Sequence, residues 1–534
     1  MTFLSLLPRF VRRFIYETSY IISRFYFFFI TSAFWLYHSL FTKKVTVPPP
    51  SDDLLQISAT QAARMIRDKE ISSLELIDAY IRRIEEVNGI LNAVVQENFE
   101  KARKQAADVD DEVENATAQQ IAEMEEKRPL LGVPFTIKDC IEIEGMKCTY
   151  GVFHRKNSRA EKTATAVERM FSAGAILLCI TNVPEVCMWW ETVNKIYGRT
   201  SNPYDNRRIC GGSSGGEGSL LAAAASLISV GSDIGGSVRM PAFFNGVFGL
   251  KPSPGTIPLT GHLPPVSGYR KQMLTIGPLC RYASDLEVMF KVLGGENVVP
   301  LRLSEPVQMH KLRVFYMEGL RSPLLEGTDN EMKYALRRAV RYMEMKYDLA
   351  AVRIDLPLAH LVVQMFMSSM ENDEDPKFSE LLSSEKGGRV SCATEMVKCV
   401  AGRSNHTFPA LLVGLLDDFE SFGDEHKKRF LYKRDRLIRE LKDLLGDNGV
   451  LLFPSAPSAA PFHNQPVFTP LNFTYTGLFN ALGLPVAQCP MGISPSKGVP
   501  LGVQVVGSPL TERNLIGIAK DLEEGFGGWT VPGK

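Results

Sequence analysis

The sequence predicts an α/β fold together with one apolar helix near the N-terminus. From about residue 130 onward, short apolar runs alternate with stretches that carry apolar residues at helical spacing, which is typical of α/β proteins. Residues 25–41 contain no Asp, Glu, Lys or Arg and consist mostly of aromatic and aliphatic residues. With 534 residues, the chain is long enough to bury a large core.

The apolar N-terminal segment is predicted to anchor the protein in a membrane. Extended back to residue 20, it approaches the roughly 20 residues of a membrane span, although it then includes Arg24. We expect a single-pass anchor in an endomembrane such as the endoplasmic reticulum or a lipid droplet; the alternatives are an interfacial helix and an uncleaved signal-like segment. The predicted parts of the chain are a basic segment (1–19), the anchor helix (20–41), a stiff proline-containing linker (42–54) and the main domain (55–534).

Basic residues on the two sides of the anchor predict its orientation. Three arginines precede it and two lysines follow it (Arg9, Arg12 and Arg13; Lys43 and Lys44). Because basic residues favour the cytoplasmic side, we expect the N-terminus in the cytoplasm and the main domain in the lumen. The Asn-Ala-Thr triplet that starts at Asn115 would then be open to glycosylation.

Local patterns assign several elements of the main domain. Ser72 and Glu75 form a capping-box pattern, and the apolar residues that follow predict a helix ending near Gly89. Residues 97–128 are charged and rich in alanine, as expected for an exposed helix or helix pair, and a further helix is predicted over residues 219–230. Strands are predicted to end near Lys138 and to cover residues 174–181, 449–454 and 501–507.

Residues 210–240 carry the strongest functional signal. They contain two glycine-dense turns that present serine, at 211–216 and 235–237. Glycine allows a positive φ and a close approach of other groups, so such a turn can direct successive N–H groups at one point, as a developing oxyanion requires. A lysine on a buried strand upstream, Lys138, could serve as a base if burial among apolar groups favours its neutral form. Taken alone, it would more often be a structural lysine paired with Asp139.

These motifs resemble the amidase signature family, serine hydrolases that use a Ser-Ser-Lys triad. The resemblance is carried by Gly-Gly-Ser-Ser-Gly-Gly-Glu-Gly at 211–218, Gly-Ser-Asp-Ile-Gly-Gly-Ser-Val-Arg at 231–239 and the upstream lysine, all in the family's order. It covers nearly everything from about residue 55 onward, and within the family the chain is most similar to the type 2 fatty acid amide hydrolases. The resemblance implies a single large domain with a mixed central β-sheet surrounded by helices.

The resemblance also implies a role for each residue of the site. Ser237 is the expected nucleophile, Ser213 relays the proton and Lys138 is the base. A cis peptide bond is expected between Gly212 and Ser213. The set expected to form the oxyanion hole and bind substrate consists of the N–H groups of Ile234, Gly235, Gly236 and Ser237, together with Ser214. A simpler interpretation of Ser214, which we also extend to Asp233 and Arg239, is that these side chains brace the two turns.

The implied reaction is hydrolysis of an amide through an acyl-Ser237 intermediate. Lipid amides, namely fatty acid amides and N-acylethanolamines, are the expected substrates, because the anchor and the resemblance both favour them. Residues 408–416 could cap an acyl channel, dip into the membrane or form a core helix, and residues 188–190 (Met-Trp-Trp) could line an acyl pocket or simply pack in the core. The alternatives are an amidase for small non-lipid amides, a catalytically silent membrane-tethered homologue and the ammonia-producing subunit of a transamidosome.

Other classes of function are disfavoured. Lys plus Arg and Asp plus Glu number 60 each, so the protein has no net positive charge that would attract nucleic acid. The nine cysteines include no CxxC pair, which argues against a zinc site. The pattern Gly-x-Ser-x-Gly at 211–215 fits a nucleophile elbow, which would make Ser213 the nucleophile and nominate His463, but it would leave Lys138 idle. We expect no cofactor and no metal; the expected partners are a lipid amide and a membrane, and a homodimer is left open.

Overall fold

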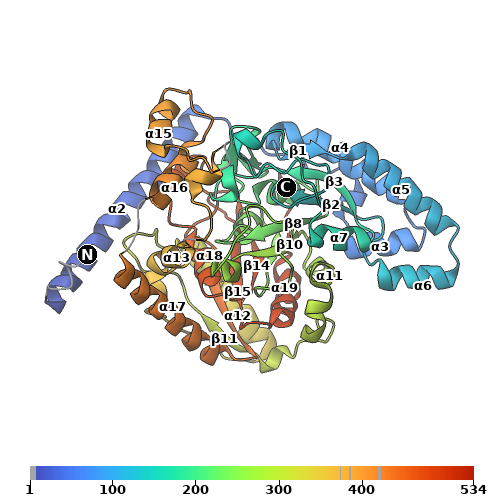
Figure 1. The fold of residues 1–534 in the computed structure, drawn as a ribbon. Coiled ribbons are helices and arrows are strands. Elements are labelled where there is room, and N and C mark those ends of the chain that lie inside the picture. Colours follow the sequence, from blue (N-terminus) through green and yellow to red (C-terminus); the bar gives the residue numbers. More distant parts are fainter. Residues whose placement is uncertain (1–7, 373, 384–386, 419–422, 534) are drawn as a thin grey trace.

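An eleven-stranded mixed sheet runs through the centre of the protein in the computed structural model, with helices packed around it (Figure 1). The structure describes residues 8–372, 374–383, 387–418 and 423–533. The strands lie in the order β1-β3-β2-β8-β10-β9-β14-β15-β13-β11-β12. They are β1 (Val94–Glu97), β2 (Pro134–Lys138), β3 (Ile176–Thr181), β8 (Ile228–Asp233), β9 (Phe248–Lys251), β10 (Thr275–Cys280), β11 (Arg313–Tyr316), β12 (Val352–Arg353), β13 (Gly449–Pro454), β14 (Val486–Ile493) and β15 (Pro500–Val506). The α/β class predicted from the sequence is confirmed.

The sheet combines parallel and antiparallel pairs. Strand β2 pairs in parallel with both β3 and β8, and β11 pairs in parallel with both β12 and β13. The strands between β8 and β13 pair antiparallel throughout, as does the edge strand β1. Two short hairpins stand apart from this sheet: β4 (Val193–Asn194) with β5 (Gly198–Arg199), and β6 (Ser201–Asn202) with β7 (Asp205–Ile209).

Helices cover more of the described chain than strands do. They are α2 (Arg9–Phe41), α3 (Ala59–Arg67), α4 (Ser73–Leu91), α5 (Phe99–Glu114), α6 (Ala118–Lys127), α7 (Thr165–Ser172), α8 (Gly215–Ala222), α9 (Arg239–Phe244), α10 (Arg270–Met273), α11 (Ser284–Gly294), α12 (Asn330–Tyr347), α13 (Val362–Met370), α14 (Phe378–Leu381), α15 (Cys392–Val400), α16 (Phe408–Asp418), α17 (Asp424–Leu445), α18 (Thr474–Ala481) and α19 (Glu512–Phe526). Helices α8 and α9 pack on each other and on the sheet, as do α11 and α19.

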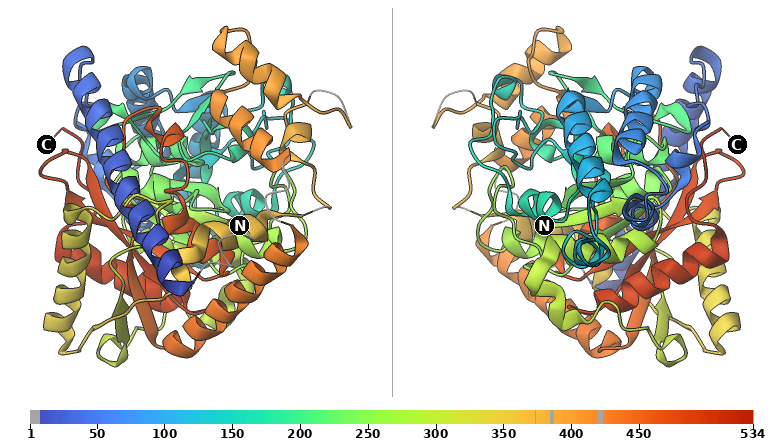
Figure 2. Two further views of the ribbon diagram at one scale, coloured as in Figure 1. Left: turned by 90° about the vertical axis from the view of Figure 1, so that its left-hand side faces the viewer. Right: turned by 90° about the vertical axis from the view of Figure 1, so that its right-hand side faces the viewer.

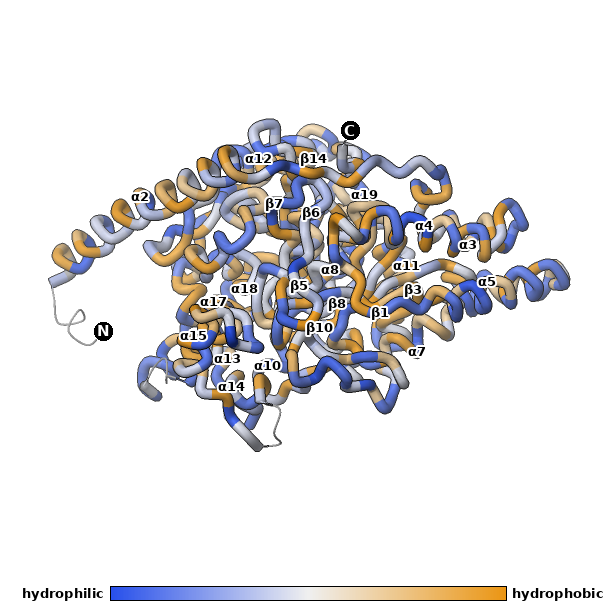
Figure 3. Tube along the Cα trace, turned by 90° about the horizontal axis from the view of Figure 1, so that it is seen from above, coloured by the Kyte–Doolittle hydropathy of each residue, from blue (hydrophilic) through white to orange (hydrophobic). Residues whose placement is uncertain are grey.

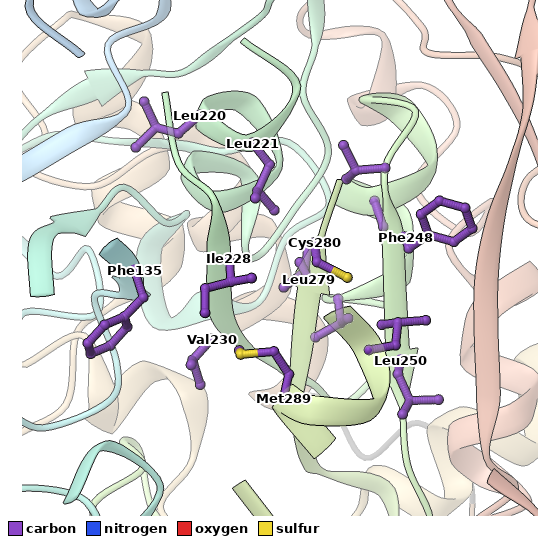
Figure 4. Close-up of a cluster of buried hydrophobic side chains, with 14 of the residues drawn as sticks. Phe135, Leu220, Leu221, Ile228, Val230, Phe248, Leu250, Leu279, Cys280 and Met289 are labelled. Atoms are coloured by element: carbon purple, nitrogen blue, oxygen red, sulfur yellow. The ribbon is translucent and has the colours of Figure 1, made fainter. Parts of the chain in front are cut away.

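The central strands are buried on both faces, and polar side chains within them bond to each other, as Thr136 and Ser229 do at 2.8 Å. Figure 4 shows Ile228 and Val230 of β8 beside Leu279 of β10, with Leu221 of α8 and Met289 of α11 packed around them. All five side chains are fully buried. This core fixes the carboxyl ends of β2 and β8 relative to each other, and the candidate site lies at these ends.

Most predicted elements of the main domain are found, with one correction. The strands predicted at 174–181, 449–454 and 501–507 and the helix pair within 97–128 are confirmed within two residues at most ends. The helix predicted over 219–230 is wrong in its second half: α8 ends at Ala222, Ala224 has a positive φ of 57°, and β8 begins at Ile228 because this segment pairs with β2 and β10. Helix α4 starts after Ser72, whose side chain accepts the N–H of Glu75 as predicted.

Helix α4 ends within two residues of the predicted position, but Gly89 is not the residue that terminates it. The helix continues to Leu91 and stops at Asn92, which has a left-handed conformation with φ 52°. Gly89 has no atom within 4 Å of the position of a β-carbon and no positive φ, so nothing there requires glycine. Burial of Leu91 in the core stabilises the last turn instead.

The N-terminal helix is longer than predicted and lies against the domain. It begins at Arg9 rather than at residue 20, so the expected boundary between a basic segment and an anchor falls inside one helix. Among the described residues it is the one helix long and apolar enough to cross a membrane, and 11% of its most apolar stretch is buried. Figure 2 (left) shows it running diagonally across one face of the domain, and its N-terminal end projects beyond the body in Figures 1 and 3.

Candidate active site

Three separate elements bring the predicted catalytic side chains to one edge of the sheet. Lys138 is the last residue of β2, Ser213 lies in the turn that leads into α8, and Ser237 lies in the turn between β8 and α9. Because β2 and β8 are parallel neighbours, their carboxyl ends meet at the same edge, where α/β proteins commonly bind ligands. Lys138 is fully buried, and Ser213 and Ser237 are exposed by only 1% and 7%.

The amine of Lys138 is surrounded by oxygen atoms of serine residues. Its Nζ lies 2.7 Å from Ser213 Oγ, 3.0 Å from Ser232 Oγ and 3.2 Å from the Ser232 carbonyl oxygen. In the described part of the chain, no carboxylate forms an ion pair with it. Asp139 instead accepts the N–H of Thr149 at 2.7 Å and also the Thr149 hydroxyl. The alternative of a structural lysine paired with its neighbour is therefore wrong.

The two glycine-rich turns hold each other in place. The N–H of Ser214 donates to the Ser237 carbonyl oxygen at 3.1 Å, and the peptide bond between Gly212 and Ser213 is cis, as the resemblance predicted. A β-carbon on Gly212 would lie 2.5 Å from the Trp189 carbonyl oxygen. On Gly236, where φ is 123°, it would lie 2.0 Å from Thr476 Oγ1. Both positions therefore require glycine.

A fully buried ion pair braces the turn that carries Ser237. Arg239 Nε and Nη2 each lie 3.0 Å from a carboxylate oxygen of Asp233. Burial opposes ionisation, but the guanidinium of Arg239 outweighs it and holds the pKa of Asp233 well below its usual value. The bracing role expected for these two residues is confirmed. Ser214 is also fully buried, and its hydroxyl donates to the Ser232 carbonyl oxygen at 3.4 Å, so its contacts lie within the scaffold.

One of the four expected oxyanion donors is already engaged. The N–H of Gly236 donates to Asp233 Oδ1 at 2.7 Å. Within the described residues, no protein acceptor is found for the N–H groups of Ile234, Gly235 and Ser237. In this structure the set available to an oxyanion is thus Ile234, Gly235 and Ser237, without Gly236.

Two functional candidates escaped the sequence analysis, Ser232 and His262. Ser232 Oγ links Lys138 to His262, whose Nε2 lies 2.9 Å away, and Cys140 Sγ lies 3.6 Å from the same nitrogen. His262 is 8% exposed, and its Nδ1 is buried with no hydrogen-bond partner in the described chain. No motif marks this histidine; it reaches the site because its loop pairs with Ile141, three residues after Lys138.

The histidine nominated by the elbow pattern does not serve Ser213. His463 Nδ1 lies 2.9 Å from Glu191 Oε1, and its Nε2 lies 3.0 Å from the Asn206 carbonyl oxygen. Both ring nitrogens are therefore committed elsewhere, whereas Ser213 contacts Lys138. The geometry supports the Ser-Ser-Lys arrangement over the elbow.

Apolar side chains flank the site. Phe366 Cζ and Phe473 Cδ2 lie 3.3 and 3.5 Å from the place that a β-carbon on Gly235 would occupy. On another side, Trp190 and Met240 line a narrow pocket that extends to Asn472. The other members of the predicted acyl-pocket group, Met188 and Trp189, are half-buried and pack against the main core.

Helix α16 contains residues 408–416, which were expected to cap an acyl channel, dip into the membrane or form a core helix. The helix is partly buried and partly exposed. Leu411 is fully buried, as expected for a core helix, whereas Leu416 is 51% exposed and Phe408 37% exposed. The helix packs on α14 and α15.

Comparison with known proteins places this geometry in context. The family model Amidase matches residues 75–516. Fatty-acid amide hydrolase 2 of Homo sapiens is 42% identical over 495 residues, which cover 92% of this chain and 92% of that protein. Fatty-acid amide hydrolase 2-A of Danio rerio is 43% identical over 495 residues, which cover 91% and 92%. A solved structure of fatty acid amide hydrolase has a TM-score of 0.71 at 22% identity, covering 90% of this chain and 87% of that one.

Proposed function

The chain belongs to the amidase family and is an amide-hydrolysing enzyme, and from this premise we propose that it hydrolyses lipid amides through an acyl-Ser237 intermediate. The observation that carries the mechanism is the 2.7 Å contact between Lys138 Nζ and Ser213 Oγ, beside the turn of Ser237. The 42% identity to a fatty-acid amide hydrolase supports the substrate class.

Neutral Lys138 has hydrogen-bonding positions that match its surroundings. Its two N–H groups can donate to the carbonyl oxygen and the hydroxyl of Ser232, at 3.2 and 3.0 Å. The lone pair then points to Ser213 Oγ and accepts its proton. Ser213 in turn takes the proton of Ser237 as that oxygen attacks the amide carbonyl.

The remaining steps return the proton and release the products. The tetrahedral intermediate places its negative oxygen near the N–H groups of Ile234, Gly235 and Ser237, each worth roughly a 10²–10³-fold increase in rate in comparable sites. As the carbon–nitrogen bond breaks, the proton on Lys138 passes through Ser213 to the leaving amine. Water then attacks acyl-Ser237, with the same two residues accepting its proton, and the fatty acid leaves.

The apolar residues around the site support a long acyl chain. Phe366 and Phe473 flank the oxyanion turn, and Trp190 and Met240 extend the apolar lining on another side. Aromatic and methionine side chains adapt well to flexible alkyl chains. Small non-lipid amides, the alternative substrates, would leave these surfaces unused.

We also propose that α2 attaches the enzyme to an endomembrane such as the endoplasmic reticulum or a lipid droplet. The support is its length, its uncharged stretch over 25–41 and its low burial. The single-pass arrangement predicted from the sequence requires α2 to leave the domain, because the polar domain surface cannot follow it into hydrocarbon.

The test uses an activity-based probe together with a substrate panel. A fluorophosphonate should label the wild-type protein and fail to label Ser237→Ala, and turnover should fall from N-acylethanolamines and primary fatty amides to short amides. Labelling that persists in Ser237→Ala would reject the nucleophile. Faster turnover of short amides than of lipid amides would reject the substrate class while leaving the mechanism intact.

A further inference from the structure

Helix α2 is docked on the domain along most of its length. Near its start, the Tyr16 hydroxyl donates to the Arg321 carbonyl oxygen at 2.7 Å; midway, the Tyr26 hydroxyl donates to the Phe468 carbonyl oxygen at 3.0 Å. Near its end, the His38 ring stacks on Phe462 with ring centres 4.3 Å apart. These contacts follow one face of the helix, so α2 lies along the surface of the domain from Tyr16 onward, and only its N-terminal end projects beyond the body.

Contact with the domain also supplies partners for Arg24, whose charge would be costly inside a membrane. Its guanidinium donates to the carbonyl oxygens of Ser322, at 3.3 Å, and Leu325. It therefore faces the domain. The residues that follow α2 are held as well: the N–H of Val47 donates to the Pro203 carbonyl oxygen at 3.0 Å, and the N–H of Val45 to Asn206 Oδ1 at 2.8 Å.

The opposite face of α2 is apolar and exposed. Its exposed large side chains are Phe10, Phe14, Ile21, Ile22, Phe25, Phe28, Phe29, Trp35, Leu36, Leu40 and Phe41. Figure 3 shows hydrophobic residues recurring along this helix. A helix with one face on a polar domain and the other exposed and apolar suits the plane of a membrane surface, not its normal.

A cavity of about 480 Å³ opens between the end of α2 and the domain. This volume lies within the roughly 300–1,000 Å³ of ligand pockets in general. Three cations line it: Lys43, which has no ion-pair or hydrogen-bond partner in the described residues, and Arg199 and Arg207. The two arginines pair with Glu191 and Asp205, which are each 1% exposed and so lie beneath the cavity surface.

His463 also lines this cavity. Its Nδ1 lies 2.9 Å from Glu191 Oε1 and its Nε2 lies 3.0 Å from the Asn206 carbonyl oxygen, so the ring is held in place. Tyr37 and Phe34 of α2 form an aromatic wall on the other side. The cavity thus combines cationic donors with aromatic rings at the end of an apolar helix.

We propose that this cavity binds the phosphate of an anionic phospholipid headgroup while α2 lies in the plane of the membrane. Lys and Arg are the usual partners of phosphate oxygens, and the acyl chains of such a lipid would run beside the exposed face of α2. The protein then carries its N-terminus and its domain on the same side of the membrane. This inference rests on the proposed membrane attachment and not on the amidase mechanism.

The test compares two adjacent lysines in the full-length protein. Lys43 lines the cavity and its neighbour Lys44 does not. Partitioning onto vesicles of phosphatidylcholine with a minor fraction of phosphatidylglycerol should fall roughly fivefold in Lys43→Gln, the effect of one basic residue at an anionic surface, and less than about twofold in Lys44→Gln. Partitioning onto pure phosphatidylcholine and hydrolysis of a soluble short-chain amide should be unchanged in both.

Three outcomes would overturn the proposal. Equal losses in Lys43→Gln and Lys44→Gln would show that both lysines act through general surface charge and that the cavity is not a specific site. Binding of glycerol 3-phosphate by the protein in solution, without vesicles, would assign the site to a soluble phosphate ester. In intact microsomes, an N-terminal tag and the domain should be digested together or protected together, whereas opposite sidedness would show that α2 spans the bilayer. Loss of amidase activity in every form would instead count against the proposed function.

Discussion

We expect His262 to act as a positioning residue for the general base, acting through Ser232. Ser232 has one hydroxyl proton and accepts an N–H from Lys138 at 3.0 Å. Its own O–H then points to His262 Nε2, 2.9 Å away. If that acceptor is lost, the Ser232 hydroxyl can turn and donate to the lone pair of Lys138, in competition with Ser213 at 2.7 Å. The fraction of enzyme with a usable base should fall.

The size of the effect follows from a single neutral hydrogen bond. Such a bond contributes about 0.5–1.5 kcal/mol, so His262→Leu should lower kcat roughly 2- to 13-fold. KM should be unchanged, because His262 contacts Ser232 and Cys140 and lies behind the amine of Lys138. His262→Gln supplies a carbonyl oxygen as acceptor and should restore most of kcat. The assay is steady-state hydrolysis of one soluble amide by the three proteins, with matching melting temperatures as the control for folding.

Wild-type kcat in His262→Leu, or a rise in KM at constant kcat, would rule out a positioning role for His262. A glutamine variant no better than leucine would indicate that the ring is needed for packing rather than as an acceptor. An effect of several orders of magnitude would also be inconsistent, because it would make His262 the base and contradict the 2.7 Å contact between Lys138 and Ser213.

Two further predictions concern the buried groups around Lys138. Lys138→Ala should lower kcat by several orders of magnitude, as removal of a base from an interdependent triad does, while His463→Ala should retain most activity; the reverse result would revive the elbow mechanism. Burial raises the pKa of Asp139 to about 7 despite the hydrogen bonds from Thr149. Since the folded protein then binds this proton more tightly than the unfolded chain, whose pKa is 3.8, the free energy of unfolding should fall as pH rises from about 4 to 7, by roughly 4 kcal/mol at most. Asp139→Asn should remove that component. Urea titrations of both proteins at pH 4.5 and 7 measure it, and an equal change in the free energy of unfolding between the two pH values would contradict the prediction.

The sequence was sufficient for features that depend on local chemistry. The strands β3, β13 and β15 follow from short apolar runs, and the turns of Ser213 and Ser237 follow from glycines that the backbone requires. Features that depend on tertiary contacts were missed. Alanine and leucine favour a helix over 219–230, but β8 forms there because its two neighbours in the sheet supply hydrogen bonds that outweigh local propensity.

His262 and the packing of α2 on the domain escaped prediction for the same physical reason. His262 lies 122 residues after Cys140 and meets it only because two loops pair at the edge of the sheet. In α2, composition alone favours a membrane span, since the sequence does not reveal that Arg24 finds two carbonyl oxygens about 300 residues away. In that contact the domain satisfies a charge that would be costly in hydrocarbon. In the in-plane attachment proposed above, the exposed apolar face of α2 would be left to meet lipid. An enzyme held in this way would keep its amide-hydrolysing edge at a fixed height above the surface from which its substrates come.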